Sequence, residues 1–279
     1  MMPIRDMVLT LLSYPDPTPE WAIAAAAAIA RQQQAVIEGA LCIGSFPQVS
    51  NVVADRLVDA GRIIAEENAR SRASGEAIAS AFAETAGADA PLHRIAWSHV
   101  ADPRPLAELA RLFDLSVLPV YGHAETASLL EALVFSSGRP VMLLPETDAA
   151  RAPGASGTIL IGWDGSRPAA RALADALPFL ATASAVEIVA VTGEKALPDN
   201  LPVDAIVRHL ARHGIEADGR EVPAEGKDAG TALLDHAERV GASLLVMGAY
   251  GQSKFREFVL GGATRTIVSA PRLPVLLSH

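Results

Sequence analysis

Cysteine and basic side chains are both scarce in this chain. The single cysteine, Cys42, excludes an intramolecular disulfide, and its place in the apolar run 41–43 predicts a core residue. Lys and Arg number 23 against 32 Asp and Glu, which gives a net charge of −9 and a pI near 5.3. An acidic chain of this kind is a poor partner for nucleic acid or for an anionic membrane, so we expect neither.

Long apolar runs are also missing. The alanine-rich stretch 22–30 is far shorter than a bilayer span and continues into Arg31 and three glutamines. Near the N-terminus, Asp6 precedes an apolar stretch, 7–12, that is too short for a secretory signal. We therefore expect a cytoplasmic protein without a membrane segment.

The sequence does contain a repeated alternation of short apolar runs and longer helical segments. With 279 residues, half of them hydrophobic, it can fill two domains of ordinary size. Alternating strands and helices predict a mostly parallel sheet in each half, with helices on both faces, in a Rossmann-like, adenine nucleotide alpha hydrolase-like arrangement. We place the domains at 1–147 and 156–279, joined by a loop-like linker within 145–157. The expected strands are 7–12, 40–44, 92–97, 114–120, 140–144, 158–163, 186–192, 218–223, 243–247 and 274–277.

A glycine pattern follows the fourth expected strand of the second half. Gly248 and Gly251 leave the apolar run 243–246, nine residues intervene, and Gly261 and Gly262 open another helical segment. Glycine allows a close approach between backbone and ligand, and a helix N-terminus offers unpaired N–H groups to an anion. This spacing is suited to the phosphates of a nucleotide.

With this spacing, the chain resembles a tandem, two-domain member of the universal stress protein family. The approach 242–248 and the closing segment 270–277 are similar to the family's fourth and last strands, and the resemblance covers the C-terminal half. It implies five-stranded parallel sheets that bind a ligand, here an adenine nucleotide such as ATP, at the carboxyl ends of the strands. That is also the expected location in an open α/β sheet. The residues that we expect to bind the nucleotide are Trp163, Asp164, Gly165, Met247, Gly248, Tyr250, Gly251, Gly261, Gly262, Ala263 and Thr264.

Asp164 has two interpretations. In the family the matching acidic residue faces the adenine, so Asp164 would accept a hydrogen bond from the base or the ribose. Asp164 and Ser166 are also both good helix N-cap residues, so the segment 164–166 equally predicts a helix start. The residues leave both interpretations open.

Gly262 departs from the family pattern, in which ATP-binding members have Ser or Thr after the last glycine. A hydrogen bond to a charged acceptor contributes about 1.5–3 kcal/mol, so loss of this hydroxyl costs roughly tenfold or more in affinity. Thr264 lies on the same incipient helix turn and compensates in part, while the backbone N–H of Gly262 remains. We expect weakened binding of ATP, alone or with Mg²⁺.

The N-terminal half lacks the glycine pattern. Its corresponding loop, 118–126, contains one glycine, and Glu125 places a negative charge where phosphates would lie. The acidic residue in Tyr14–Pro15–Asp16 is shifted by two positions, and 136–139 is typical of a helix-to-strand turn. We interpret this half as degenerate for nucleotide, a structural partner or the holder of another small molecule.

Other catalytic patterns are missing. The chain has no phosphate loop that ends in Gly-Lys-Ser/Thr, and no residue stands out as a general base. His209 and His213 are four apart, as zinc ligands can be, but a solvated helix face explains them better. A non-catalytic protein is therefore favoured over an enzyme, with slow ATP hydrolysis left open.

Two functions remain at this stage. The first is a nucleotide-responsive stress protein that acts through an unidentified protein partner. The second is an interaction module with both sites decayed, which Gly262 and Gln252 favour. A tandem chain can also pair its halves internally, with 141–144 beside 275–277, to form an intramolecular pseudo-dimer. Further homodimerisation stays open.

Overall fold

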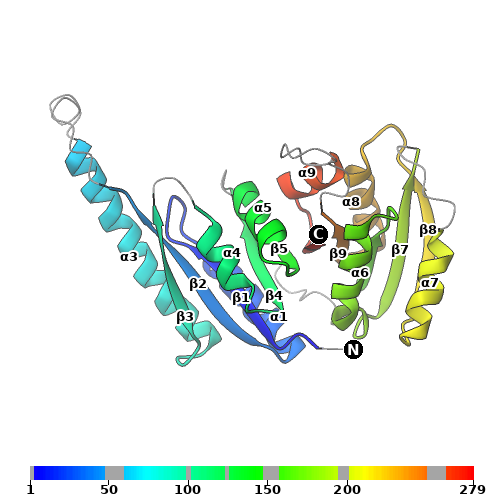
Figure 1. The fold of residues 1–279 in the computed structure, drawn as a ribbon, viewed down its shortest axis with the longest axis horizontal. Helices are drawn as coiled ribbons and strands as arrows, with labels where there is room; N and C mark the ends of the chain where they lie inside the picture. The colour runs from blue at the N-terminus through cyan, green and yellow to red at the C-terminus, as the bar shows by residue number, and fades with distance from the viewer. Residues whose placement is uncertain are drawn as a thin grey trace.

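A computed structural model describes residues 3–47, 60–98, 102–122, 126–146, 157–193, 201–249 and 262–279. Both halves alternate strands and helices (Figure 1). The N-terminal half contains β1 (Asp6–Leu12), α1 (Glu20–Gln33), β2 (Val36–Ser45), α3 (Ala60–Ala86), β3 (Leu92–Ser98), α4 (Arg104–Ala110), β4 (Leu115–Val120), α5 (Thr126–Ser136) and β5 (Val141–Pro145). The C-terminal half contains β6 (Thr158–Gly162), α6 (Arg167–Leu180), β7 (Ala185–Thr192), α7 (Val203–Arg212), β8 (Asp218–Pro223), α8 (Ala229–Val240), β9 (Ala242–Gly248), α9 (Gly262–Ser269) and β10 (Val275–Ser278). All ten strands expected from the sequence are confirmed, with ends that differ by at most four residues.

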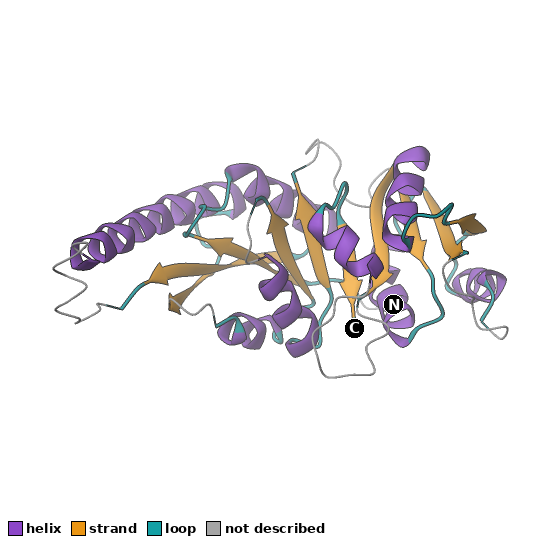
Figure 2. Ribbon diagram, turned by 90° about the horizontal axis from the view of Figure 1, so that it is seen from above, coloured by secondary structure: helices purple, strands orange, loops and turns teal. Residues whose placement is uncertain are grey.

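The strands form one ten-stranded sheet in the order β3-β2-β1-β4-β5-β10-β9-β6-β7-β8. Within each half every pairing is parallel, and the strand order is the same in both halves. The sheet twists strongly along its length, with helices on both sides (Figure 2). The predicted fold class is therefore confirmed.

Side chains alternate between two faces of the sheet, and each face has its own core. In β1, Leu9 and Leu11 belong to one cluster, which is covered by α1, α3, α6 and α7. Val8 and Leu12 belong to the other, which is covered by α4, α5, α8 and α9. Parallel strands that are buried on both faces are continuous apolar runs, which is why the sequence shows them so clearly.

The two halves join where β5 and β10 run antiparallel. Leu276 lies opposite Met142, and both are fully buried in the first cluster. The flanking pairs, such as Val275 with Leu143, belong to the second cluster. Each core thus continues across the seam between the halves, and the predicted pairing of 141–144 with 275–277 is confirmed.

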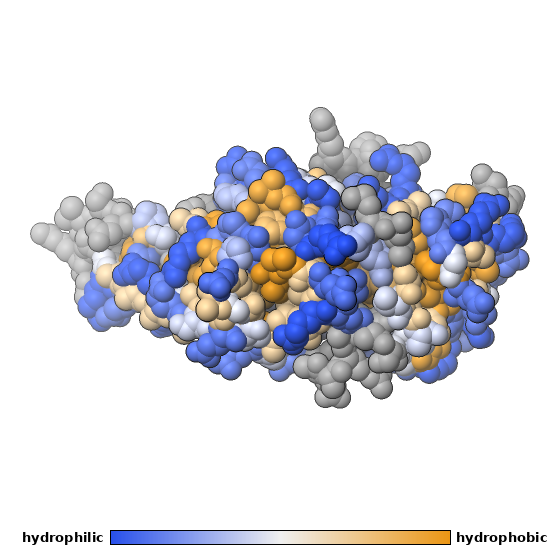
Figure 3. Space-filling view, turned by 90° about the horizontal axis from the view of Figure 1, so that it is seen from below, coloured by the Kyte–Doolittle hydropathy of each residue, from blue (hydrophilic) through white to orange (hydrophobic). Residues whose placement is uncertain are grey.

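The outer strands of the sheet are β3 and β8. β8 exposes Asp218, Arg220 and Glu221, and charges at a free edge discourage pairing with another chain. Large exposed apolar side chains are few among the described residues: Val36, Ile63, Leu112 and Phe135. On the face seen from below, hydrophilic residues surround the separate apolar patches (Figure 3). None of the helices in the described segments is long and apolar enough to cross a membrane.

Candidate functional site

Each half has one point where the order of its strands reverses. The chain winds from β1 to β2 and β3, then returns to the other side of β1 with β4, and the second half repeats this with β6 and β9. Open α/β sheets bind ligands in the crevice at the carboxyl ends of the strands at such a point. In the C-terminal half, these ends carry the predicted residues Trp163–Gly165 and Met247–Gly248.

The segment after β6 is a tight turn into α6. Asp164 is exposed, and its Oδ1 accepts the Ser166 N–H at 2.9 Å. Ser166 is the N-cap of α6, and its Oγ accepts the Ala169 N–H at 3.2 Å. Gly165 has a φ of +72°, which favours glycine. The predicted helix start is therefore confirmed, while the exposed carboxylate of Asp164 remains able to accept a further hydrogen bond.

Trp163 faces the core. Its side chain is 5% exposed, and its Nε1–H donates to the Leu201 carbonyl at 3.2 Å. The indole thus anchors the segment that precedes α7. Met247 is likewise buried, in the second cluster. Any contact that these two residues make with a ligand would therefore come from their backbone.

Gly248 has a structural role that the sequence did not reveal. A Cβ added there would lie 2.4 Å from the Ala169 nitrogen and 2.5 Å from the Pro168 carbonyl carbon. The end of β9 therefore packs directly against the first turn of α6, as only glycine permits. This packing brings the carboxyl ends of β6 and β9 together.

The helix α9 starts at Gly262, which is exposed. Among the described residues, no atom lies within 4 Å of a Cβ added at Gly262, in the first turn of this helix. Thr264, expected to supply a compensating hydroxyl, is 4% exposed. The predicted binding residues Tyr250, Gly251 and Gly261 lie outside the described residues.

Two residues near α9 escaped the sequence analysis. A Cβ at Gly230 in α8 would lie 2.6 Å from the Ala263 carbonyl oxygen, so α8 and α9 approach closely at this glycine. Asp228 is the N-cap of α8, and its Oδ1 accepts the Thr231 N–H at 3.1 Å. Burial raises the pKa of this carboxyl, but hydrogen bonds from Thr231, Thr266 and the Gly230 backbone together outweigh burial and hold the pKa below its usual value. An Asp followed by a helical segment is the only sequence signal for this cap.

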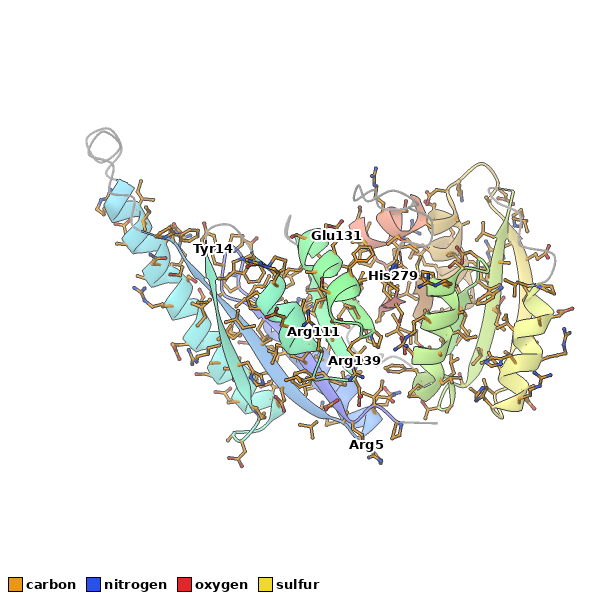
Figure 4. All side chains as sticks on the ribbon, in the orientation of Figure 1. Arg5, Tyr14, Arg111, Glu131, Arg139 and His279 are labelled. Carbon is orange, nitrogen blue, oxygen red and sulfur yellow. The ribbon has the colours of Figure 1, made fainter. Side chains whose placement is uncertain are left out.

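The two halves can be aligned through their strand ends. The Ser13 N–H donates to the Cys42 carbonyl at 3.1 Å, just as the Trp163 N–H donates to the Val189 carbonyl at 2.8 Å. Ser13 therefore corresponds to Trp163, and Tyr14 corresponds to Asp164. Tyr14 packs edge-to-face on Phe46, with ring centroids 4.8 Å apart, and lies at the carboxyl ends of the N-terminal strands (Figure 4).

Tyr121 stands where the C-terminal half has Gly248. Leu9 pairs with Val117, so three residues further on Leu12 lies beside Val120. Leu12 corresponds to Gly162, which pairs with Met247. Val120 therefore corresponds to Met247, and Tyr121 to Gly248. The Tyr121 hydroxyl lies 2.7 Å from Thr18 Oγ1, in the loop before α1. Burial raises the pKa of Tyr121 to about 12. Tyr121 thus occupies the point at which the strand order of the N-terminal half reverses.

Other sequence predictions are confirmed or lie outside the described residues. Cys42 is buried, and burial raises the pKa of its thiol. Ser137 forms the predicted helix-to-strand turn, and its Oγ accepts the Arg139 N–H at 3.1 Å. Glu125 lies outside the described residues. His209 on α7 and His213, the C-cap residue of that helix, are exposed as expected. The described segments hold no group of three or more metal-ligating side chains.

Comparisons with known proteins agree with this geometry. The model of the universal stress protein family matches residues 156–279. A universal stress protein from Archaeoglobus fulgidus DSM 4304 has a similar structure, with a TM-score of 0.67, 15% identity and 97% of each chain covered. A functionally unknown protein from Pseudomonas aeruginosa PAO1 has a TM-score of 0.54 and 14% identity, over 99% of this chain and 92% of that one. At these identities the solved structures show the fold alone. Among curated proteins, none matches the chain.

Proposed function

We propose that the C-terminal half of the chain binds an adenine nucleotide, ATP. The match of residues 156–279 to the family model means that this half belongs to the universal stress protein family. Binding would change contacts with a protein partner during a stress response in the cytoplasm. The observation that carries the proposal is the start of α9 at Gly262, where no atom of the described residues lies within 4 Å of an added Cβ. The same half has a glycine, Gly248, at the point where its strand order reverses. An anion can approach backbone N–H groups there without meeting a side chain of the described part of the chain.

The residues present fit such a nucleotide. Asp164 is exposed at the end of β6, where its carboxylate can accept a hydrogen bond from the adenine amino group or a ribose hydroxyl. The N–H groups of Gly262 and Ala263, at the start of α9, can donate to phosphate oxygens, and the helix dipole favours negative charge at that end. In this proposal Mg²⁺ binds as a complex with the phosphates of the nucleotide.

We further propose one nucleotide per chain. Tyr121 and Thr18 fill the N-terminal reversal point with their hydrogen bond, at the place that Gly248 leaves without a side chain. The N-terminal half then contributes structure rather than a second nucleotide site. The alternative function, a nucleotide-independent interaction module, is favoured by the missing hydroxyl at Gly262.

Equilibrium binding of ATP, measured by isothermal titration calorimetry, tests the proposal. We expect saturable binding with a stoichiometry of one. We expect Asp164→Ala to weaken it and Gly262→Ser to strengthen it roughly tenfold, because the serine hydroxyl can bond a charged phosphate. Gly262→Ala is the matched control, since it adds the Cβ alone. No binding at millimolar ATP would leave the interaction module as the better function.

A further inference from the structure

The residue that follows Gly248 is held by Ser278 and His279, at the end of β10. The Ala249 N–H donates to the Ser278 carbonyl at 2.8 Å, and Nδ1 of His279 lies 3.0 Å from the Ala249 carbonyl oxygen. Because a carbonyl oxygen only accepts, His279 must donate through Nδ1–H. Ala249 is fully buried, so both of its backbone polar groups are satisfied by the segment at the end of β10.

The imidazole of His279 also touches the N-terminal half. Its ring packs edge-to-face on Phe135 of α5, with centroids 4.8 Å apart and an interplanar angle of 70°. Figure 4 shows His279 between the two halves, beside α5. Aromatic pairs in this geometry have a preferred orientation, so Phe135 favours one ring position of His279.

The same strand end is fixed on its other side by α6. The Ser278 hydroxyl donates to Oδ2 of Asp175 at 2.9 Å, and Arg171 donates to the same carboxylate oxygen at 2.8 Å. The first turn of this helix packs against Gly248. The backbone from Gly248 to Ala249 is therefore held by α6 on one side and by His279 on the other.

We infer that His279 is a positioning residue for the nucleotide site, and that Phe135 of the N-terminal half holds the imidazole ring of His279 in its orientation. The inference rests on the proposed function. A peptide group is planar, so a hydrogen bond to the Ala249 carbonyl fixes the orientation of that carbonyl group, one residue after Gly248. The N-terminal half thus supports the site of the C-terminal half across the β5–β10 seam.

Two substitutions of His279 separate its hydrogen bond from its packing. His279→Asn keeps an N–H donor at the same branch position as Nδ1 but removes the ring, whereas His279→Phe keeps a ring and removes the donor. Phe135→Ala removes the support from the other half. Leu112→Ala is its matched control, because Leu112 is an apolar side chain of the same half that is 72% exposed.

Three measurements are made on each variant: the ATP dissociation constant, the urea unfolding midpoint, and amide hydrogen exchange at Ala249 without nucleotide. We expect His279→Phe and Phe135→Ala to weaken ATP binding about three- to tenfold, as the loss of one net hydrogen bond does. Both should speed exchange at Ala249. His279→Asn should stay within about twofold of the wild type in affinity, and Leu112→Ala should match it.

The outcomes distinguish this inference from the proposed function. If the wild-type chain binds no ATP, the proposed function fails, and the inference fails with it. If the wild type binds ATP but His279→Phe and Phe135→Ala bind equally well, only the inference is overturned. Equal loss of affinity in His279→Asn and His279→Phe would also overturn it, since the N–H donor would then be irrelevant.

Discussion

Replacing Gly248 by alanine is expected to lower the stability of the fold, whatever ligand the site binds. Its would-be Cβ lies 2.4 Å from the Ala169 nitrogen, 2.5 Å from the Pro168 carbonyl carbon and 2.8 Å from the Pro168 Cβ. Ordinary contacts of a Cβ begin near 3.4 Å, so β9 and α6 would have to separate by about 1 Å. Two of the three atoms belong to backbone, which cannot rotate away as a side chain can.

The cost of Gly248→Ala follows from this geometry. Overpacking a well-filled core typically costs about 1–3 kcal/mol, and we expect the upper part of that range, about 2–3 kcal/mol, because the obstacle is backbone. The assay is equilibrium unfolding in urea, followed by circular dichroism, with the change in free energy taken from the midpoint and slope. The same variant should also bind ATP less well, since the turn into α6 is displaced.

Gly262→Ala supplies the matched control from the same glycine pattern. Its added methyl would meet no atom of the described segments within 4 Å, and it lies in the first turn of α9. Alanine is favoured over glycine in helices by about 0.5–1 kcal/mol, so this variant should be no less stable than the wild type. The reasoning is refuted if Gly248→Ala unfolds at the wild-type midpoint, or if the two alanine variants lose equal stability.

Three further predictions concern other parts of the fold. The pKa of Tyr121 is raised to about 12, so the unfolded chain releases this proton near pH 10 before the folded one does. Stability should therefore fall between about pH 10 and 12, and Tyr121→Phe should flatten that fall in urea unfolding at each pH. Glu187→Ala should lower the free energy of unfolding by about 1–3 kcal/mol, because buried His236 loses its hydrogen-bond acceptor at 2.9 Å. His236→Ala should cost less, because Glu187 keeps its ion-pair partner Arg220 at 2.8 Å. Leu276→Ala, at the fully buried seam, should cost about 2–5 kcal/mol in thermal or urea unfolding, and a loss below 1 kcal/mol would contradict a shared core.

Much of the fold could be predicted because buried parallel strands are easy to recognise in the sequence. Strands such as β1 and β9 are buried on both faces and are therefore continuous apolar runs, which periodicity detects without any tertiary information. The seam could also be anticipated, since an apolar last strand such as β10 needs a partner. The N-cap Ser166 was recognisable from its residue type and place.

The candidate site was less accessible to sequence reasoning. The glycine pattern identifies the family, but Gly248 serves the packing of β9 on α6 as well as any ligand. Trp163 looked like a site residue by position, yet its indole lies in the first core cluster and donates to the Leu201 carbonyl. Asp228 and Gly230 lie far from the pattern in sequence and reach α9 only through folding. Spacing along the chain cannot report which side of a strand end faces a neighbouring helix.

The sequence by itself determined the two-fold repetition, the order of strands and helices, and the half of the chain that carries the glycine pattern. These properties are local, because each depends on the residues of one segment and their period. Only the tertiary structure decided that Tyr121 occupies the place of Gly248, and that Phe135 reaches Ala249 through His279. Such relations join residues that are distant in the chain, and strand register and packing across the seam bring them together.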